Sequence, residues 1–223
     1  MKTQKPSSLR QATAKYLVKS QGIPFTPIWS SADASKLLEI RAESKYKFDA
    51  MFLYLLTESL LWMPEMNASW DEDKKEEQII LRDSINLGLS LNTKDDNVVV
   101  ARVADPDRKT AFQINRAVVE LAEKAKIGKI HEKDIFPLPN IVLNNVGMMD
   151  IEGSVPIPLP WNAFMVTTFR IKRIPVADQD KDFSIGVLPM MNIVLTFDHR
   201  LFDGAKAAKF LTLFKQKLEN PRF

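Results

Sequence analysis

The chain has 223 residues, of which 45% are hydrophobic and 26% are charged, a composition typical of a globular protein with a sizeable core. The formal net charge is only +3, and no dense cluster of Lys and Arg with interleaved aromatic residues is present, which argues against nucleic acid as a partner. The chain contains no cysteine, and this excludes disulfide bonds, Cys-ligated zinc, iron–sulfur clusters and thiol nucleophiles.

Neither the N-terminal segment nor the most apolar stretch indicates a membrane or a secretory route. No apolar run follows the basic residues of MKTQKPSSLR, so no secretory signal is predicted. The apolar stretch 48–63 is short for a bilayer span and contains Asp49 and Glu58, which favours a buried helix. We therefore expect a cytoplasmic location and no membrane partner.

The first third of the sequence predicts helices with one extended segment between them. Ser7 or Ser8 can cap a first helix, which Gly22 and Pro24 would end. The charged run DEDKKEE is typical of a solvated loop. In order, the predicted segments are a helix to about Ser20, an extended stretch over 25–30, a helix from Ser31 or Asp33, a helix over 48–63 and the loop over 71–77.

From residue 78 onward the hydrophobic pattern indicates strands and two further helices. The run NVVVARV is the clearest strand, and Ile114, Val118 and Leu121 form one helical stripe. The predicted strands cover 78–82, 85–91, 97–103, 140–146, 162–172 and 183–197, with a hairpin turn at 178–182, and the helices cover 108–126 and 204–218. This order predicts an α/β or α+β sandwich, a mixed sheet flanked by helices. Residues 1–6 are expected to be a tail and 7–221 a single domain.

The segment 195–218 is the most informative for function. An apolar strand runs directly into the tripeptide Asp198-His199-Arg200. Asp203 follows and opens an amphipathic helix. Rigid elements on both sides would fix a reactive side chain at this junction. His199 is therefore the candidate catalytic residue.

The same residues also allow a purely structural interpretation. The Asp203 carboxylate can accept N–H groups at the helix start as an N-cap. Asp198 and Arg200 can form a surface ion pair of little energetic value, with His199 a structural histidine between them. The second histidine, His131, lies in the polar stretch KIHEKD and is not expected to be functional.

The run DHRLFDG resembles the DHRxxDG signature of the catalytic domain of dihydrolipoamide acyltransferases. These are the core subunits of 2-oxo acid dehydrogenase complexes and share the chloramphenicol acetyltransferase fold. Other segments resemble the same family in the same order, and the resemblance covers about residues 7–221. The matching segments are SSLRQATAKYLVKSQGIPFT, MPEMNASW, INLGLSLNT, VVVARVAD and VLNNVGM.

This resemblance implies direct acyl transfer from a thioester to a thiol, with His199 as the general base. A thiol of pKa about 8.5 is mostly protonated at neutral pH, whereas an imidazole of pKa about 6.5 is mostly neutral and can accept the proton. The gap of about two pKa units costs roughly 2.7 kcal/mol, which positioning can offset. Coenzyme A is then a substrate, no cofactor is bound covalently, no metal is involved, and a lipoyl group is supplied only by a partner.

The resemblance also implies supporting roles for other residues. Asp203 matches an aspartate that anchors the loop bearing the histidine, through an arginine of the first helix that matches Arg10. Arg200 belongs to the same motif and is expected to support the site. Asn144 lies where the family usually has a Ser or Thr that donates to the oxyanion of the tetrahedral intermediate. An Asn amide can donate this bond if its nitrogen faces the oxyanion, and loss of one such donor costs about a hundred- to thousandfold in rate.

By resemblance the protein is a homotrimer with its active sites between subunits, so that Asn144 neighbours the His199 of another chain. The sequence shows no lipoyl domain and no peripheral-subunit-binding domain, so a dihydrolipoyl substrate is expected on a separate lipoylated partner. The replacement at Asn144 leaves open a catalytically weakened trimeric scaffold of the same fold. A third interpretation is a small-molecule O-acetyltransferase like chloramphenicol acetyltransferase, but those enzymes typically carry a His-His pair where Asp198-His199 stands here.

Overall fold

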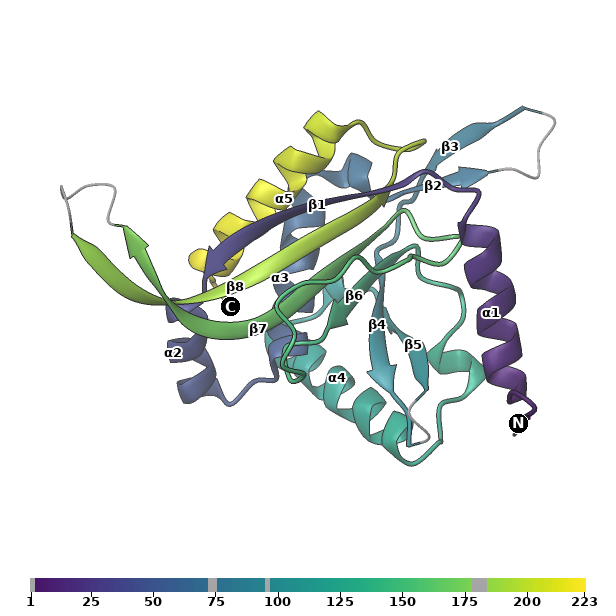
Figure 1. Cartoon of the computed structure of the whole chain (residues 1–223), viewed down its shortest axis with the longest axis horizontal. Coiled ribbons are helices and arrows are strands. Elements are labelled where there is room, and N and C mark those ends of the chain that lie inside the picture. The colour runs from purple at the N-terminus through teal and green to yellow at the C-terminus, as the bar shows by residue number, and fades with distance from the viewer. Residues whose placement is uncertain (1–2, 72–75, 95–96, 178–183) are drawn as a thin grey trace.

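The computed structural model describes residues 3–71, 76–94, 97–177 and 184–223, and Figure 1 gives their arrangement. The helices are α1 (Ser8–Ser20), α2 (Ser35–Ser44), α3 (Phe48–Trp62), α4 (Ala111–Lys126) and α5 (Gly204–Glu219). The strands are β1 (Phe25–Asp33), β2 (Ala68–Asp71), β3 (Gln78–Leu81), β4 (Asn86–Asn92), β5 (Val98–Ala104), β6 (Ile141–Asn145), β7 (Phe164–Ala177) and β8 (Ile185–Asp198). Short 3-10 turns lie at Pro64–Met66, Pro106–Arg108 and Glu132–Asp134.

Six strands form one mixed sheet in the order β1-β8-β7-β6-β4-β5, and β2 pairs with β3 in a separate two-stranded sheet. β6 runs parallel to both of its neighbours, β4 and β7, whereas the other neighbouring strands of the large sheet are antiparallel. Parallel strands require a crossover connection, and the chain between β4 and β6 contains α4. The predicted mixed sheet flanked by helices is confirmed.

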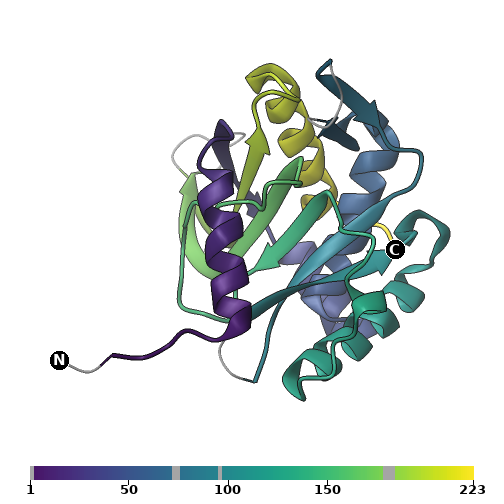
Figure 2. The same cartoon turned by 90° about the vertical axis from the view of Figure 1, so that its right-hand side faces the viewer.

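The hydrophobic core lies between one face of the large sheet and a layer of helices that includes α3, α4 and α5 (Figures 1 and 2). Alternate strand residues such as Leu143 and Phe197 face this core, because successive side chains of a strand point to opposite faces. Nine of the 15 residues of α3 are buried, as expected for a helix that is apolar around most of its circumference. The apolar stretch 48–63 is therefore a core helix, as its sequence predicted.

The opposite face of the sheet is turned toward the viewer in Figure 1 and is much less covered. Trp29 of β1 lies on this face, paired in register with Val194 of β8, and is 73% exposed. The segment 147–162 crosses part of the face, where the Asn192 side-chain amide donates to the Glu152 carbonyl at 2.9 Å. A single chain thus leaves apolar sheet surface exposed to solvent.

The first helix, α1, is fastened near its C-terminal end. The ring of Tyr16 lies edge-on to that of Trp161, with 5.0 Å between the ring centres. The Ser20 hydroxyl donates to the Pro158 carbonyl at 2.8 Å. Ser7 caps the other end, where its side chain accepts from a backbone N–H at 3.2 Å, so the predicted cap and the helix end near Ser20 are both confirmed.

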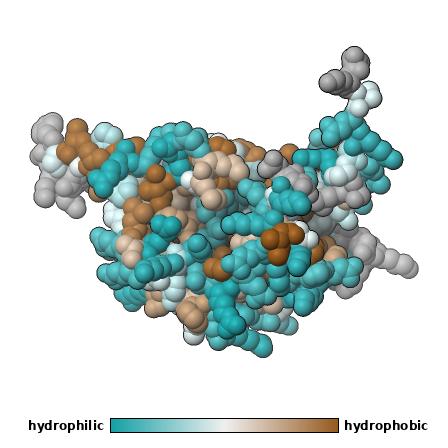
Figure 3. Space-filling model, turned by 90° about the horizontal axis from the view of Figure 1, so that it is seen from below, coloured by the Kyte–Doolittle hydropathy of each residue, from teal (hydrophilic) through white to brown (hydrophobic). Residues whose placement is uncertain are grey.

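No helix in the described part of the chain combines the length and apolar character needed to cross a bilayer. Figure 3 views the molecule from below and shows a surface that is mostly hydrophilic, with separate hydrophobic patches. Isolated apolar patches of this kind are ordinary on folded proteins.

The structure departs from the predicted elements in several places. β7 continues to Ala177, past the predicted end at 172, and α4 begins at Ala111 and not at 108. The strand β2 was not predicted, and it pairs with the predicted strand at 78–82. The second helix begins only at Ser35, because β1 continues to Asp33, whose carboxylate accepts from the Ser35 backbone N–H at 2.9 Å. The predicted turn at 178–182, and residues 72–75 of the predicted loop, lie outside the described residues.

Candidate active site

The turn that follows β8 is built around the buried carboxylate of Asp198, which is 2% exposed. Its Oδ1 accepts from the backbone N–H of Arg200 at 2.9 Å, and its Oδ2 accepts from the guanidinium Nη2 at 2.8 Å. Its backbone carbonyl accepts from the N–H groups of Leu201 at 3.0 Å and Phe202 at 3.3 Å. The ion pair allowed by the sequence is therefore confirmed, but its expected place at the surface is wrong: the carboxylate is buried and charge-assisted hydrogen bonds hold the turn.

Arg200 extends this turn toward the small sheet. Its guanidinium lies 5.0 Å from the centre of the Trp70 ring of β2, within the range of a cation–π contact. The same side chain therefore touches the end of β8 and the β2–β3 hairpin. These contacts agree with a supporting role for Arg200, which stays a prediction.

His199 is the exposed residue of the turn. Its backbone N–H donates to the Pro24 carbonyl at 3.1 Å, and its ring centre lies 5.4 Å from that of the buried Phe197. The backbone is thus fixed while the imidazole keeps access to solvent. A general base needs this combination of a held position and an accessible ring nitrogen.

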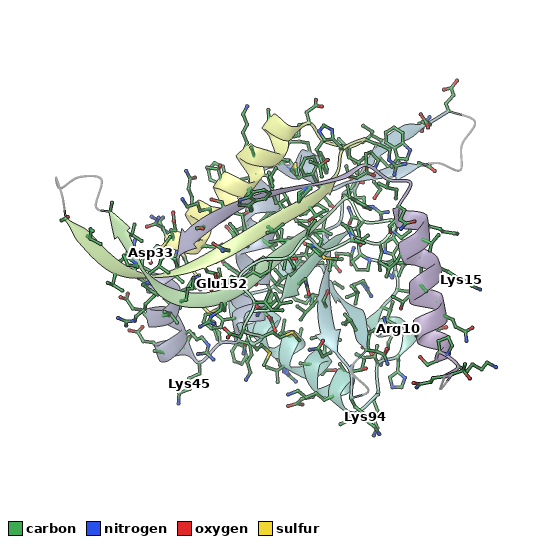
Figure 4. The ribbon with its side chains drawn as sticks, viewed as in Figure 1. Arg10, Lys15, Asp33, Lys45, Lys94 and Glu152 are labelled. Carbon is green, nitrogen blue, oxygen red and sulfur yellow. The ribbon has the colours of Figure 1, made fainter. Side chains whose placement is uncertain are left out.

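Asp203 and Arg10 are not brought together within the chain. Asp203 is the N-cap residue of α5, but its carboxylate makes no capping hydrogen bond, so the alternative interpretation of Asp203 as a side-chain cap is wrong. Arg10 lies in the first turn of α1, about 15 Å before Ser20 at about 1.5 Å per residue. Figure 4 shows Arg10 low on α1, whereas α5 begins at the top of the view. No ion pair joins the two residues in the described part of the chain.

Asn144 is the second-last residue of β6 and pairs in parallel register with Thr167 of β7. Its neighbours Leu143 and Asn145 point toward the helix layer, so alternation along the strand places the Asn144 side chain on the open face. Within the described residues its amide makes no hydrogen bond. It is therefore available to an incoming group.

His199 and Asn144 lie far apart in a single chain. In the sheet register Asn144 is level with Thr167 of β7 and Val194 of β8. His199 lies five residues beyond Val194, which corresponds to roughly 16 Å along the strands, and two strand spacings of about 4.8 Å separate β6 from β8. One chain cannot direct both side chains at one substrate atom.

The residue after Asn144 is engaged in three hydrogen bonds. The Asn145 Nδ2 donates to Asp49 Oδ1 at 2.6 Å. Its Oδ1 accepts from the Gly147 backbone N–H at 2.9 Å and from the Thr168 hydroxyl at 3.1 Å. Burial raises the pKa of the Asp49 carboxyl above its ordinary value, while the hydrogen bond from Asn145 and the positive charge of Lys47 oppose part of that increase. The start of α3, the end of β6 and the middle of β7 meet at this amide.

A cavity of about 620 Å³ opens beside this amide, between α2, the first turn of α3, β7 and β8. Its volume falls within the range of roughly 300–1,000 Å³ usual for small-molecule sites. Aromatic side chains line part of it, among them Phe52 and Phe169. Four cationic residues also line it, which are Arg41, Lys47, Lys172 and Arg173. We call it the cationic cavity; among the described residues that line it, Asp49 alone is acidic.

Sequence reasoning did not identify the cationic cavity or the Asp49–Asn145 contact. Arg41 lies in α2, Lys47 precedes α3, and Lys172 and Arg173 are adjacent in β7, so charge patterning does not show that these segments meet. The sequence did contain one sign of the Asp49 contact: a carboxylate in the first turn of a mostly apolar helix. His131 is exposed in the connection between α4 and β6, and its backbone N–H donates to Asp134 at 3.0 Å, in agreement with its polar sequence surroundings.

Comparison with known proteins places this chain in a family. The whole chain, residues 1–223, matches the family model described as 2-oxoacid dehydrogenases acyltransferase (catalytic domain). A dihydrolipoyllysine-residue acetyltransferase component of the pyruvate dehydrogenase complex from Mycobacterium bovis is 30% identical over 99% of this chain. That match covers 42% of the relative, so the chain spans about two fifths of its length.

Solved structures agree with the family assignment. A probable dihydrolipoamide acetyltransferase from Listeria monocytogenes has a TM-score of 0.87 and 28% identity, covering 99% of this chain and 95% of that chain. A chloramphenicol acetyltransferase has a TM-score of 0.58 at 17% identity over 92% of each chain, which shows a shared fold alone. The resemblance found in the DHRLFDG motif and the collinear segments is thereby confirmed. The chain belongs to the 2-oxoacid dehydrogenase acyltransferase family, as a catalytic domain with the chloramphenicol acetyltransferase-like fold.

Proposed function

We propose that this chain transfers an acyl group between a thioester and a thiol, with His199 as the general base. The observation that carries the proposal is the position of His199. Its imidazole is exposed on a turn whose backbone is held by the buried Asp198 and by the Pro24 carbonyl. The family membership supports the same chemistry, because its members named above are acetyltransferases.

In the proposed reaction the neutral imidazole of His199 accepts the S–H proton of the acceptor thiol as its sulfur attacks the acyl carbonyl. The carbonyl oxygen gains the negative charge of the tetrahedral intermediate, and the Asn144 Nδ2 donates a hydrogen bond to it. When the intermediate collapses, the C–S bond of the donor breaks and the leaving thiolate takes the proton from the imidazolium. No net proton is gained or lost.

The distance between the two residues requires two chains for one site. We infer a homotrimer in which His199 of one protomer meets Asn144 of the next, because a head-to-tail contact that closes into a ring gives every protomer the same interface. The exposed Trp29 and its neighbours on the open sheet face supply apolar surface for such a contact. An assembly of this kind also covers the apolar surface that a lone chain exposes.

The cationic cavity fits coenzyme A as the thiol or thioester substrate. Coenzyme A combines phosphate groups with an apolar and amide-containing arm, and Lys47 and Arg173 offer cations beside the aromatic Phe52 and Phe169. Lysine and arginine side chains are the usual partners of phosphate. The other substrate is a dihydrolipoyl group carried on a partner protein.

The test is acetyl transfer from acetyl-CoA to free dihydrolipoamide, with the acetylated product measured by chromatography. His199→Ala should lower kcat by about a hundred- to ten-thousandfold, the range typical of a lost general base. Equal rates for the wild type and His199→Ala with every acceptor would instead favour a non-catalytic scaffold. Acetylation of chloramphenicol without transfer to dihydrolipoamide would favour a small-molecule O-acetyltransferase.

A further inference from the structure

We propose that Asp49 is a positioning residue for this reaction, because its carboxylate holds Asn145 and thereby fixes the neighbouring Asn144. This inference rests on the proposed function, in which the Asn144 amide donates to the oxyanion. Asp49 touches neither the sulfur nor the carbonyl in that scheme. It acts through the end of β6.

The hydrogen bonds of Asn145 have a fixed direction. A carboxylate only accepts, so the NH₂ group of Asn145 faces Asp49. The Asn145 oxygen then faces two donors, the Gly147 N–H at 2.9 Å and the Thr168 hydroxyl at 3.1 Å. Removal of the carboxylate leaves the amide free to rotate, and rotation would break the other two bonds. One carboxylate therefore orders three elements.

The packing around Gly147 makes this arrangement tight. A Cβ at this position would lie 3.0 Å from the Asn145 Oδ1 and 3.0 Å from the Phe169 carbonyl oxygen. The turn after β6 thus packs directly on the Asn145 amide and on β7. The Asn145 amide has little room to move by itself. A change in its position would therefore also displace the backbone of β6.

Asn144 depends on that backbone. Its side chain has no hydrogen-bond partner among the described residues, so the strand alone sets its direction. Its backbone pairs with Thr167, and the next residue pair, Asn145 and Thr168, is joined by the hydroxyl–amide bond of 3.1 Å. An oxyanion donor must be placed within tenths of an ångström to act. The contact between Asp49 and Asn145 provides this precision for Asn144.

Asp49 lines the cationic cavity, but its proposed role there is not to bind the ligand. A carboxylate opposes the binding of a phosphate-bearing ligand, and the cavity otherwise presents cations such as Lys47 and Lys172. Its presence there is explained by the contact with Asn145 and not by attraction for coenzyme A. Loss of Asp49 should therefore lower kcat and leave the KM for coenzyme A unchanged or lower.

The experiment compares Asp49→Ala and Asp49→Asn with wild type, using Glu58→Gln as the matched control. Glu58 lies on the same helix and pairs with Lys217 at 3.7 Å, outside the cationic cavity. Asp49→Ala should lower kcat about ten- to a hundredfold without raising the KM for coenzyme A. Asp49→Asn keeps an oxygen that can accept from Asn145, so kcat should stay within about threefold of wild type. Glu58→Gln should change neither constant.

Hydrogen exchange of residues 141–149 gives a second readout that needs no activity. Exchange should be faster in Asp49→Ala and unchanged in Asp49→Asn and Glu58→Gln. Unchanged exchange in Asp49→Ala, or equal loss of kcat in both Asp49 variants, would overturn the positioning role. If His199→Ala is as active as wild type, the proposed function fails independently of these results, and the exchange data still decide whether Asp49 orders β6.

Discussion

At the scale of single residues, two adjacent pairs each combine a residue held by hydrogen bonds with a residue whose side chain is accessible. Asp198 is buried and bonded whereas His199 beside it is exposed, and Asn145 is bonded on one side of β6 whereas Asn144 is available on the other. In β6 this follows because successive strand residues face opposite ways. At His199 it follows from the turn after β8, which exposes the imidazole while Asp198 stays buried.

Removal of Asp198 and removal of Arg200 should lower the free energy of unfolding by different amounts. Arg200→Ala leaves a carboxylate that is 2% exposed without its cation, and should cost about 3–5 kcal/mol of unfolding free energy. Asp198→Ala leaves a guanidinium that is 23% exposed and can reach water, and should cost about 2 kcal/mol. Urea unfolding at one fixed protein concentration measures both.

The double variant of Asp198 and Arg200 is the control for this comparison. It removes both charges, so its cost should be smaller than the sum of the two single costs. Additive losses would contradict a direct interaction. A larger loss for Asp198→Ala than for Arg200→Ala would show that the carboxylate is not the constrained partner.

At the scale of elements, β6 depends on close contact with β4. Gly88 of β4 pairs with Val142 of β6 in parallel register. A Cβ on Gly88 would lie 2.6 Å from a methyl of Val100, 2.8 Å from the ring of Pro139 and 3.0 Å from a methyl of Val142. The space is filled by the side chains of three neighbouring segments. A side chain at this position would therefore collide with the side chains packed over this part of the sheet.

Gly88→Ala should destabilise the fold by about 1–3 kcal/mol, the usual cost of overpacking a core. Gly186→Ala is the matched control on β8, because no atom lies within 4 Å of its added Cβ, and its effect should stay within about 0.5 kcal/mol. Thermal or urea unfolding of both variants measures the difference. Equal stabilities would mean that the side chains around Gly88 can move aside without cost.

At the scale of the whole molecule, a single chain leaves the site incomplete. The sheet register separates His199 from Asn144 by roughly 16 Å along the strands. The open sheet face exposes Trp29, and α1 carries Arg10 away from Asp203. Each of these features is explained if neighbouring chains complete what one chain lacks.

Mixing two inactive variants tests whether the site is shared. His199→Ala and Asn144→Ala should each be nearly inactive alone. When the two are co-expressed or refolded together, about a quarter of the sites in a randomly mixed ring combine an intact His199 with an intact Asn144. Activity should return to about that fraction of wild type. No recovery in mixtures of confirmed trimeric mass would show that each chain uses only its own residues.

Local physical chemistry made most of the elements predictable. The Ser7 cap, the apolar helix over 48–63 and the alternating strands each follow from interactions between residues close in sequence. The DHRLFDG motif and its collinear segments likewise identified the family, and His199 as the candidate base. The strand β2 escaped prediction because it is short and gains its hydrogen bonds from β3.

What the sequence by itself determined was therefore the order of most elements and the family, and it supplied His199 as the candidate base. Only the tertiary structure decided that Asp198 is buried, that Asp49 holds Asn145, and that cations from separate elements surround one cavity. These features depend on which segments distant in sequence are packed together. Burial and charge proximity are properties of that packing, so no local pattern could have specified them.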